Sequence, residues 1–146
     1  MFDTMGLDSL IIDLDQIREI DDDTWNRMLE AGGEIIRQAH EEKIRELFAA
    51  HTGHLAGSPY VHKKRSGSQR YVLIYPKGTH HTYRSRRSKG GGSAQASNQD
   101  VAFVQEFGGH GNYPSQWMRT ANEQHTSDAV DAMEAVFDEF LSNHNL

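Results

Sequence analysis

The chain has 146 residues, the size of one domain, so we expect residues 1–146 to fold as a single unit. Hydrophobic residues make up only 36%, which predicts a modest core with segments outside it. Cysteine is absent, which excludes disulfides, thiolate catalysis and zinc sites built on cysteine. The first residues lack the pattern of a signal peptide, and the longest apolar run, Tyr71–Tyr75, cannot span a membrane. We therefore expect a soluble protein, made in the cytoplasm, with no membrane partner.

The charged residues are segregated along the chain. Residues 51–98 contain nine Lys and Arg and no Asp or Glu. Residues 1–50 contain 13 acids against five bases, and residues 99–146 contain eight acids against one base. Since a surface of one sign attracts a partner of the other, the basic block could meet nucleic acid, a membrane or the acidic flanks of another copy, and of these we do not expect the membrane.

The first 50 residues predict two helices. Apolar residues spaced by three and four between Leu7 and Ile20 indicate a short amphipathic helix. Residues 21–24, Asp-Asp-Asp-Thr, then offer N-cap side chains and negative charge for a second helix. Apolar residues from Trp25 to Phe48 form one stripe along this second helix, which spans about 25 residues.

Glycines mark the middle and the end of the second helix. Gly32-Gly33 interrupts it at a cost near 1 kcal/mol per glycine, which points to a bend or to close packing. We expect the helix to end near His51, with Gly53 as a left-handed C-cap.

Two strands are expected next, at residues 58–65 and 69–76, with residues 66–68 as a hairpin turn. In the second strand Val72 and Ile74 point to one face, while Tyr71, Leu73 and Tyr75 point to the other. Both faces are apolar. The strand is therefore either central in a sheet or covered by something outside the monomer.

Residues 77–98 differ in kind from the rest and are expected to form a flexible basic arm within the domain. Tyr83 is their only large apolar residue, so they cannot bury enough surface to offset the entropy of ordering. A long loop inside a compact domain is usually functional or disordered. The candidate contact residues of this arm, to a subunit or to DNA, are Lys77, Tyr83, Arg84, Arg86, Arg87 and Lys89.

The remaining residues predict a short element and a long helix. Residues 100–107 fit a helix or a strand equally well, and residues 108–114 are rich in glycine and read as a turn. Apolar residues from Trp117 to Leu141 then follow a helical period, with Thr126–Asp128 as a candidate cap for a second section.

Nothing in the sequence indicates catalysis, a cofactor or a metal. Histidines occur as His51 with His54 and as the pair His80-His81, but no carboxylate between residues 51 and 98 completes a metal site. The glycine-rich segments at 90–92 and 108–111 lack the strand–loop–helix context of a phosphate-binding loop. We therefore expect a protein that is not an enzyme.

Three segments carry a family resemblance in the same order along the chain. Residues 51–58 (HTGHLAGS) resemble the "TG-x-L-x-x-S" that follows the long first helix in tail-completion, or head–tail joining, proteins of long-tailed phages of the lambdoid type. Residues 101–108 (VAFVQEFG) are similar to that family's "A-x-x-x-E-[FY]-G". Residues 113–121 resemble the aromatic and proline-rich turn that opens its C-terminal helix. The positions that carry the resemblance are Thr52, Gly53, Leu55, Ser58, Glu106, Phe107, Gly108, Trp117, Met118 and Ala121.

The resemblance and the patterns together imply an α/β (α+β) fold. Its small, mainly antiparallel sheet would be packed by long N- and C-terminal helices and would carry the extended basic loop. Gly53 and Gly108 can take positive φ at the ends of elements. Glu106, among apolar neighbours, would need a partner such as a backbone N–H or Arg119. The candidate core anchors are Leu55, Phe107, Trp117 and Met118.

By the same resemblance, the chain is expected in the neck of a virion as a ring-forming subunit, a hexamer in the family. Its neighbours would be a head connector and a tail-terminator or tail-tube protein. The basic arm would lie on the acidic helices of the next copy or would transiently contact DNA in the channel. The alternative is a small nucleic-acid-binding protein that uses residues 77–89.

Overall fold

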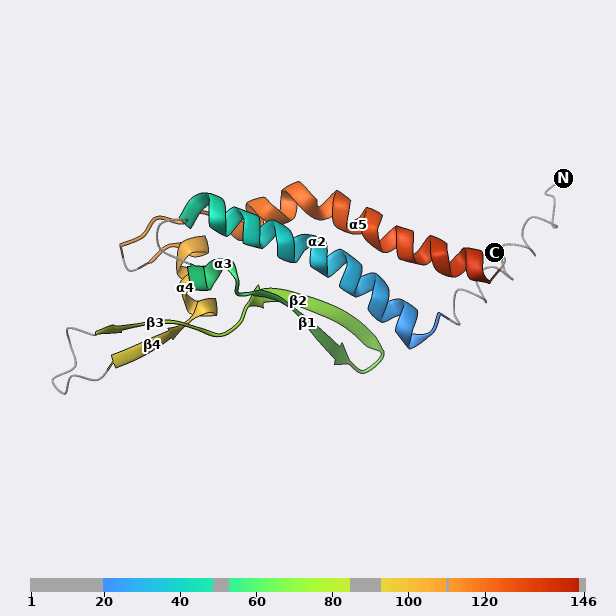
Figure 1. The fold of residues 1–146 in the computed structure, drawn as a ribbon, viewed down its shortest axis with the longest axis horizontal. Coiled ribbons are helices and arrows are strands. Elements are labelled where there is room, and N and C mark those ends of the chain that lie inside the picture. Colours follow the sequence, from blue (N-terminus) through green and yellow to red (C-terminus); the bar gives the residue numbers. More distant parts are fainter. Residues whose placement is uncertain (1–19, 49–52, 85–92, 110, 145–146) are drawn as a thin grey trace.

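A long helix, α2 (Asp22–Phe48), lies at the centre of the molecule and has other elements on two sides (Figure 1). The computed structural model describes residues 20–48, 53–84, 93–109 and 111–144. Helix α5 (Trp117–Asn143) runs along one side of α2, and the hairpin of strands β1 (Pro59–Ser66) and β2 (Gln69–Pro76) packs on the other. This α+β architecture confirms the predicted fold class. The helix expected before residue 20 lies outside the described residues.

Helix α2 begins where the acidic run predicts. Asp21 Oδ1 accepts a hydrogen bond from the Thr24 backbone N–H at 2.7 Å, which satisfies one of the free amides of the first turn. The hydrogen bonds from Thr24 lower the pKa of the Asp21 carboxyl below its usual range. The helix ends at Phe48, and Gly53 is not its C-cap: Gly53 opens the separate short helix α3 (Gly53–Ala56).

The adjacent glycines of α2 serve close packing on two sides. A Cβ placed on Gly32 would lie 2.8 Å from Met133 Cγ and 3.2 Å from the Ala129 carbonyl oxygen, both in α5. A Cβ on Gly33 would lie 3.0 Å from Val61 Cγ1 in β1. The absence of two side chains thus brings α5 and the hairpin against α2 at the same level of the helix.

The β1–β2 hairpin follows the predicted strands closely. Its register pairs Pro59 with Pro76 and Ser66 with Gln69, and Gly67 at the turn has φ 58. Glycine at the first position of a two-residue turn matches the right-handed twist of the strands. The strand cations are held by α2: Lys63 Nζ lies 3.0 Å from Glu30 Oε2, and both Arg65 and Arg70 pair with Asp22.

Part of the predicted basic arm is a second antiparallel ribbon rather than a loop. Strands β3 (Thr79–Arg84) and β4 (Ser93–Ser97) pair from Thr79 opposite Ser97 to Arg84 opposite Ser93. Backbone hydrogen bonding across the ribbon supplies order that side-chain burial alone would not, and the sequence pattern could not show this. The ribbon points away from α2 and the hairpin (Figure 1). Residues 85–92, with Arg86, Arg87 and Lys89, lie outside the described residues.

The ambiguous segment near residue 100 is helix α4 (Asn98–Phe107). Its N-cap is Ser97, whose Oγ accepts a hydrogen bond from the Asp100 backbone N–H at 3.0 Å. Helix α5 runs without a break, so the expected cap at residues 126–128 is wrong; Thr126 Oγ1 instead donates to the Asn122 carbonyl oxygen within the helix. No helix in the described part of the chain combines the length and apolar character of a membrane span.

The close approach at Gly32 generates a stability prediction. Gly32→Val should lower the free energy of unfolding by about 1–3 kcal/mol, because the added methyls meet Met133 and the α5 backbone. Adding Met133→Ala should recover part of the loss, since the two positions touch. Urea denaturation measures both. Glu42→Val, at an exposed α2 position, is the matched control and should change stability little; an equal loss in both variants would contradict the packing role.

Candidate functional site

Several of the positions that carry the family resemblance lie at one junction, where α2, α3, α4 and α5 come together. Leu55 and Trp117 are fully buried there with Ile44 and Ala102, as expected of core anchors. Trp117 Nε1 donates to the Ala102 carbonyl oxygen at 3.2 Å. Segments about 60 residues apart in the sequence thus share one small core.

The other motif positions surround this core. Met118 is partly buried and packs against it, and Ala121 is buried one turn further along α5. Ser58 is buried between α3 and β1, and its Oγ donates to the Leu55 carbonyl oxygen at 2.6 Å. Ser58 thereby fixes the turn from α3 into β1. Thr52 lies outside the described residues.

Glu106 anchors the start of α5. The N-cap residue of α5, Gln116, has φ 51 and makes no side-chain capping bond. The buried Glu106 carboxylate takes that role: it accepts hydrogen bonds from the backbone N–H of Met118 at 2.6 Å and of Arg119 at 3.2 Å. A carboxylate at a helix N-terminus is stabilised by the free amides and the helix dipole. The expected backbone partner of Glu106 is thus confirmed.

The two residues after Glu106 behave differently from each other. Gly108 has φ 82, as expected, and a Cβ there would lie 3.0 Å from the Asn112 carbonyl oxygen and from Pro114 Cδ. Phe107 is 71% exposed, so its predicted role as a core anchor is wrong. Because Glu106 faces α5, the next residue on α4 is turned about 100° away, toward solvent, where it lies near Phe103.

A buried histidine at the same junction gave no signal in the sequence. His40 of α2 is 2% exposed, and its ring meets that of Trp117 edge-on at 5.3 Å. Its Nε2 lies 2.8 Å from Asn122 Oδ1 and donates to it, which leaves Nδ1 buried without a hydrogen-bond partner among the described residues. Burial lowers the pKa of His40 below its ordinary 6.5.

The hairpin presents an uncovered aromatic surface, here called the outer face. Residues that pair across the two strands share a face of the sheet. Val61 and Val72 contact α2, so the side chains that alternate with them in the register lie on the opposite face. Within this set Tyr60 and Leu73 are each 44% exposed, and Tyr71 is 40% exposed. The outer face consists of Tyr60, His62, Lys64, Tyr71, Leu73 and Tyr75.

Ring contacts organise the outer face. The His62 ring stacks on Tyr75 with centroids 3.6 Å apart and meets Tyr60 edge-on at 5.0 Å. Lys77 Nζ lies 3.6 Å from the centroid of the Tyr60 ring, a cation–π contact. Lys77 therefore joins the outer face, whereas for Tyr83 and Arg84 the structure gives only a place in β3.

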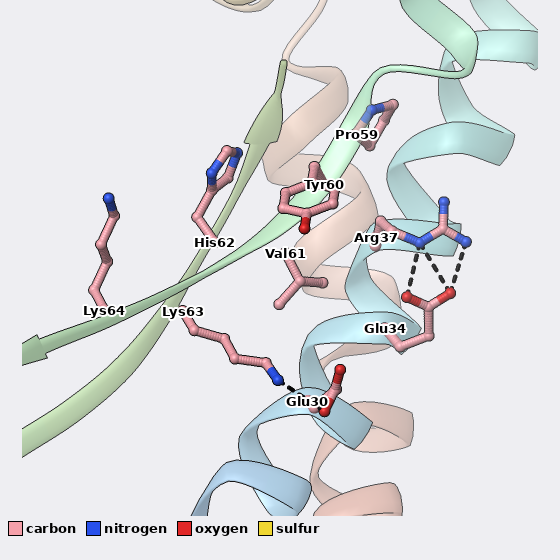
Figure 2. Close-up of a pocket in the computed structure, with 9 residues that line it drawn as sticks. All are labelled: Glu30, Glu34, Arg37, Pro59, Tyr60, Val61, His62, Lys63 and Lys64. Atoms are coloured by element: carbon pink, nitrogen blue, oxygen red, sulfur yellow. Dashed lines mark hydrogen bonds and ion pairs between the residues drawn. The ribbon is translucent and has the colours of Figure 1, made fainter.

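A groove of about 680 Å³ runs between β1 and α2 (Figure 2). Most of its charged side chains are already paired: Lys63 reaches Glu30 across the groove, and Arg37 binds Glu34 at 2.7 Å. Arg37 also binds Glu41 at 2.9 Å, and these carboxylates raise the pKa of its guanidinium. The groove is thus lined mainly by charges that neutralise one another. Its residues stabilise the contact between hairpin and helix.

The side of α5 away from α2 carries the opposite charge. Val130 is 45% exposed there, and exposed acids lie within two turns of it. Asp131, Glu134 and Asp138 have no ion-pair partner within the described part of the chain. This surface, with Val130, is called the acidic face of α5.

No family model matches the chain, and comparisons with curated proteins and with solved structures likewise give no match. Among the described residues, no group of three or more His, Asp or Glu side chains is placed to hold a metal ion. A function for this chain must therefore be inferred from the surfaces and the junction described above.

The Glu106 cap predicts a specific loss of stability. Glu106→Ala should lower the free energy of unfolding by about 1–3 kcal/mol, because two amides at the start of α5 lose a buried acceptor. Glu106→Gln, which keeps one acceptor oxygen, should lose less. Thermal unfolding followed by circular dichroism measures both. Glu123→Gln, an exposed acid on α5, is the control; a loss as large as that of Glu106→Ala would contradict the capping role.

His40 predicts a pH dependence below neutrality. Because the folded state lowers its pKa, the unfolded chain binds a proton first as the pH falls through about 6.5. The free energy of unfolding should then fall by up to about 1.4 kcal/mol per pH unit from this residue. Urea denaturation between pH 7.5 and 5.5 measures it. His40→Gln, which cannot titrate, should show a flatter dependence; parallel curves for the two proteins would contradict the assignment.

Proposed function

We propose that this chain is a structural subunit of the neck of a tailed virus particle. It acts by assembly, as a ring-forming tail-completion or head–tail joining protein. The motif order supports the proposal, and Leu55, Trp117 and Met118, which carry part of the resemblance, share one small core. Within the proposal the virion neck is its location and the host cytoplasm the place of synthesis.

The observation that carries the proposal is a pair of unlike surfaces on one chain. The outer face of the hairpin is aromatic and basic, and α5 presents acids on the far side of α2 (Figure 1). Two different surfaces that complement each other make a head-to-tail contact, and such a contact closes into a ring when the rotation allows. The family's hexamer is the expected closure.

Ion pairs within one protomer neutralise some of its cations, so only the remaining cations are available for contact with another copy. Lys63, Arg65 and Arg70 are neutralised by acids of α2 in the same protomer. The remaining cations belong to the outer face and to residues 77–89, and the uncompensated acids described above belong to α5. In the proposed assembly, the basic surface of one subunit therefore meets the acidic surface of the next. The neighbours in the neck would be a head connector and a tail-terminator or tail-tube protein.

Nucleic-acid binding through residues 77–89 is the second candidate, and the Lys77–Tyr60 pair favours it. A cation beside an aromatic ring suits a phosphate next to a stacked base. Size-exclusion chromatography with and without a short DNA, at low and high salt, separates the two functions. A 1:1 complex with DNA that dissociates steeply with salt would support this candidate, whereas an oligomer formed without DNA supports the neck subunit.

The basic segment predicts an assembly defect. Replacing Arg84, Arg86 and Arg87 with Ser should leave the fold and its thermal unfolding unchanged, because arginine is seldom a core residue. Loss of three charges should weaken the contact with the acidic helices of the next copy and lower the yield of assembled particles in a complementation assay.

A control with the same loss of charge isolates the position from the net charge. Arg27, Arg45 and Arg119, on α2 and α5, make exposed ion pairs that contribute little to stability. Their replacement by Ser should leave particle assembly near normal. Normal assembly with the Arg84, Arg86 and Arg87 variant would show that the segment has no part in the contact.

A further inference from the structure

We infer that the outer face of the hairpin is covered, in the assembly, by the acidic face of α5 from a second copy of this chain. The inference rests on the proposed function, because it assigns the surfaces through which neighbouring subunits meet. The outer face leaves three large side chains, Tyr60, Tyr71 and Leu73, about two-fifths exposed on one side of a two-stranded sheet. A contiguous apolar patch of this kind marks an interaction surface.

The inner face of the same hairpin shows which shape fits a sheet of this width. There a single helix, α2, lies along both strands, with Gly33 against Val61 and Val72. A second helix on the outer face would place the hairpin between two helices. The apolar pattern on both faces of β2 is that of a strand covered on both sides.

Charge selects α5 as that second helix. Lys64 and Lys77 lie on or beside the outer face, and neither has an ion-pair partner among the described residues. The acidic face of α5 offers exposed Val130 and three uncompensated carboxylates that follow it along the helix. A helix with an exposed apolar residue next to acids complements tyrosine and leucine next to lysines.

The geometry requires that the helix come from another copy. The protomer's own α5 lies on the far side of α2 from the hairpin, so it cannot reach the outer face (Figure 1). Pairing of two outer faces would oppose lysine to lysine, which is unfavourable. The contact is therefore between unlike surfaces, each subunit giving its α5 to one neighbour and its hairpin to the other.

Site-directed disulfide formation tests the contact, and the absence of cysteine from the chain gives it a clean background. In Leu73→Cys combined with Val130→Cys, the two thiols of one chain face different neighbours. Mild oxidation should produce a ladder of cross-linked species on non-reducing gels. The yield should exceed that of a control pair by about tenfold or more, because a bound neighbour presents its thiol at a millimolar effective concentration.

The control pair is Leu73→Cys with Tyr113→Cys, since Tyr113 is 92% exposed but lies in the loop before α5. Each single variant alone can form no species larger than a dimer. Lys64→Glu and Lys77→Glu added to the test pair should lower the ladder, whereas a fold defect would appear separately in circular dichroism. A ladder that is absent, or equally strong in the control pair, overturns the inference.

The proposed function fails by a different result. Rings in electron micrographs of the wild-type protein, together with a negative cross-link, would keep the neck subunit and reject this contact. A ladder that extends into open filaments, with particle assembly unaffected when the gene is removed, would keep the contact and reject the neck role.

Discussion

The packing of α2 on two sides at once is the constraint on which the rest of the structure depends. Gly32 admits α5 and Gly33 admits the hairpin, so a single level of one helix sets the spacing of both neighbours. Each glycine costs about 1 kcal/mol of helix stability relative to alanine, and the close contacts on either side offset that cost. The Glu106 cap then fixes where α5 begins, and Trp117 secures that end in the core.

This arrangement uses α2 to cover one face of the hairpin and leaves nothing from the described protomer to cover the other. Several large apolar residues outside the two long helices are exposed, among them Tyr60, Leu73 and Phe107. A small domain with a modest core gains much of its stability from partners when such faces are buried. Three hairpin cations, Lys63, Arg65 and Arg70, are bound by acids of α2, and Lys64 is left without an ion-pair partner among the described residues.

Local sequence patterns predicted most of the fold, because the periodicity of helices and strands and the residues that cap helices depend on residues close together in the sequence. The start of α2, both strands of the hairpin and the burial of Leu55 and Trp117 follow from them. Glu106 could be predicted to need a backbone partner, since a carboxylate among apolar residues must be satisfied. Three features could not be predicted because they depend on tertiary contacts. They are the side of α4 on which Phe107 lies, the pairing of β3 with β4, and the burial of His40. The outer face was foreseen only as an alternative, because its exposure depends on how many strands join the sheet.

The proposed function requires that this chain self-associate head to tail through unlike charged surfaces. Sedimentation velocity of the purified full chain, over a concentration series at low and high salt, measures this most directly. We expect a species of several copies at low salt that returns toward the 16.5 kDa monomer as salt screens the contact. A monomer at every concentration and salt would contradict it.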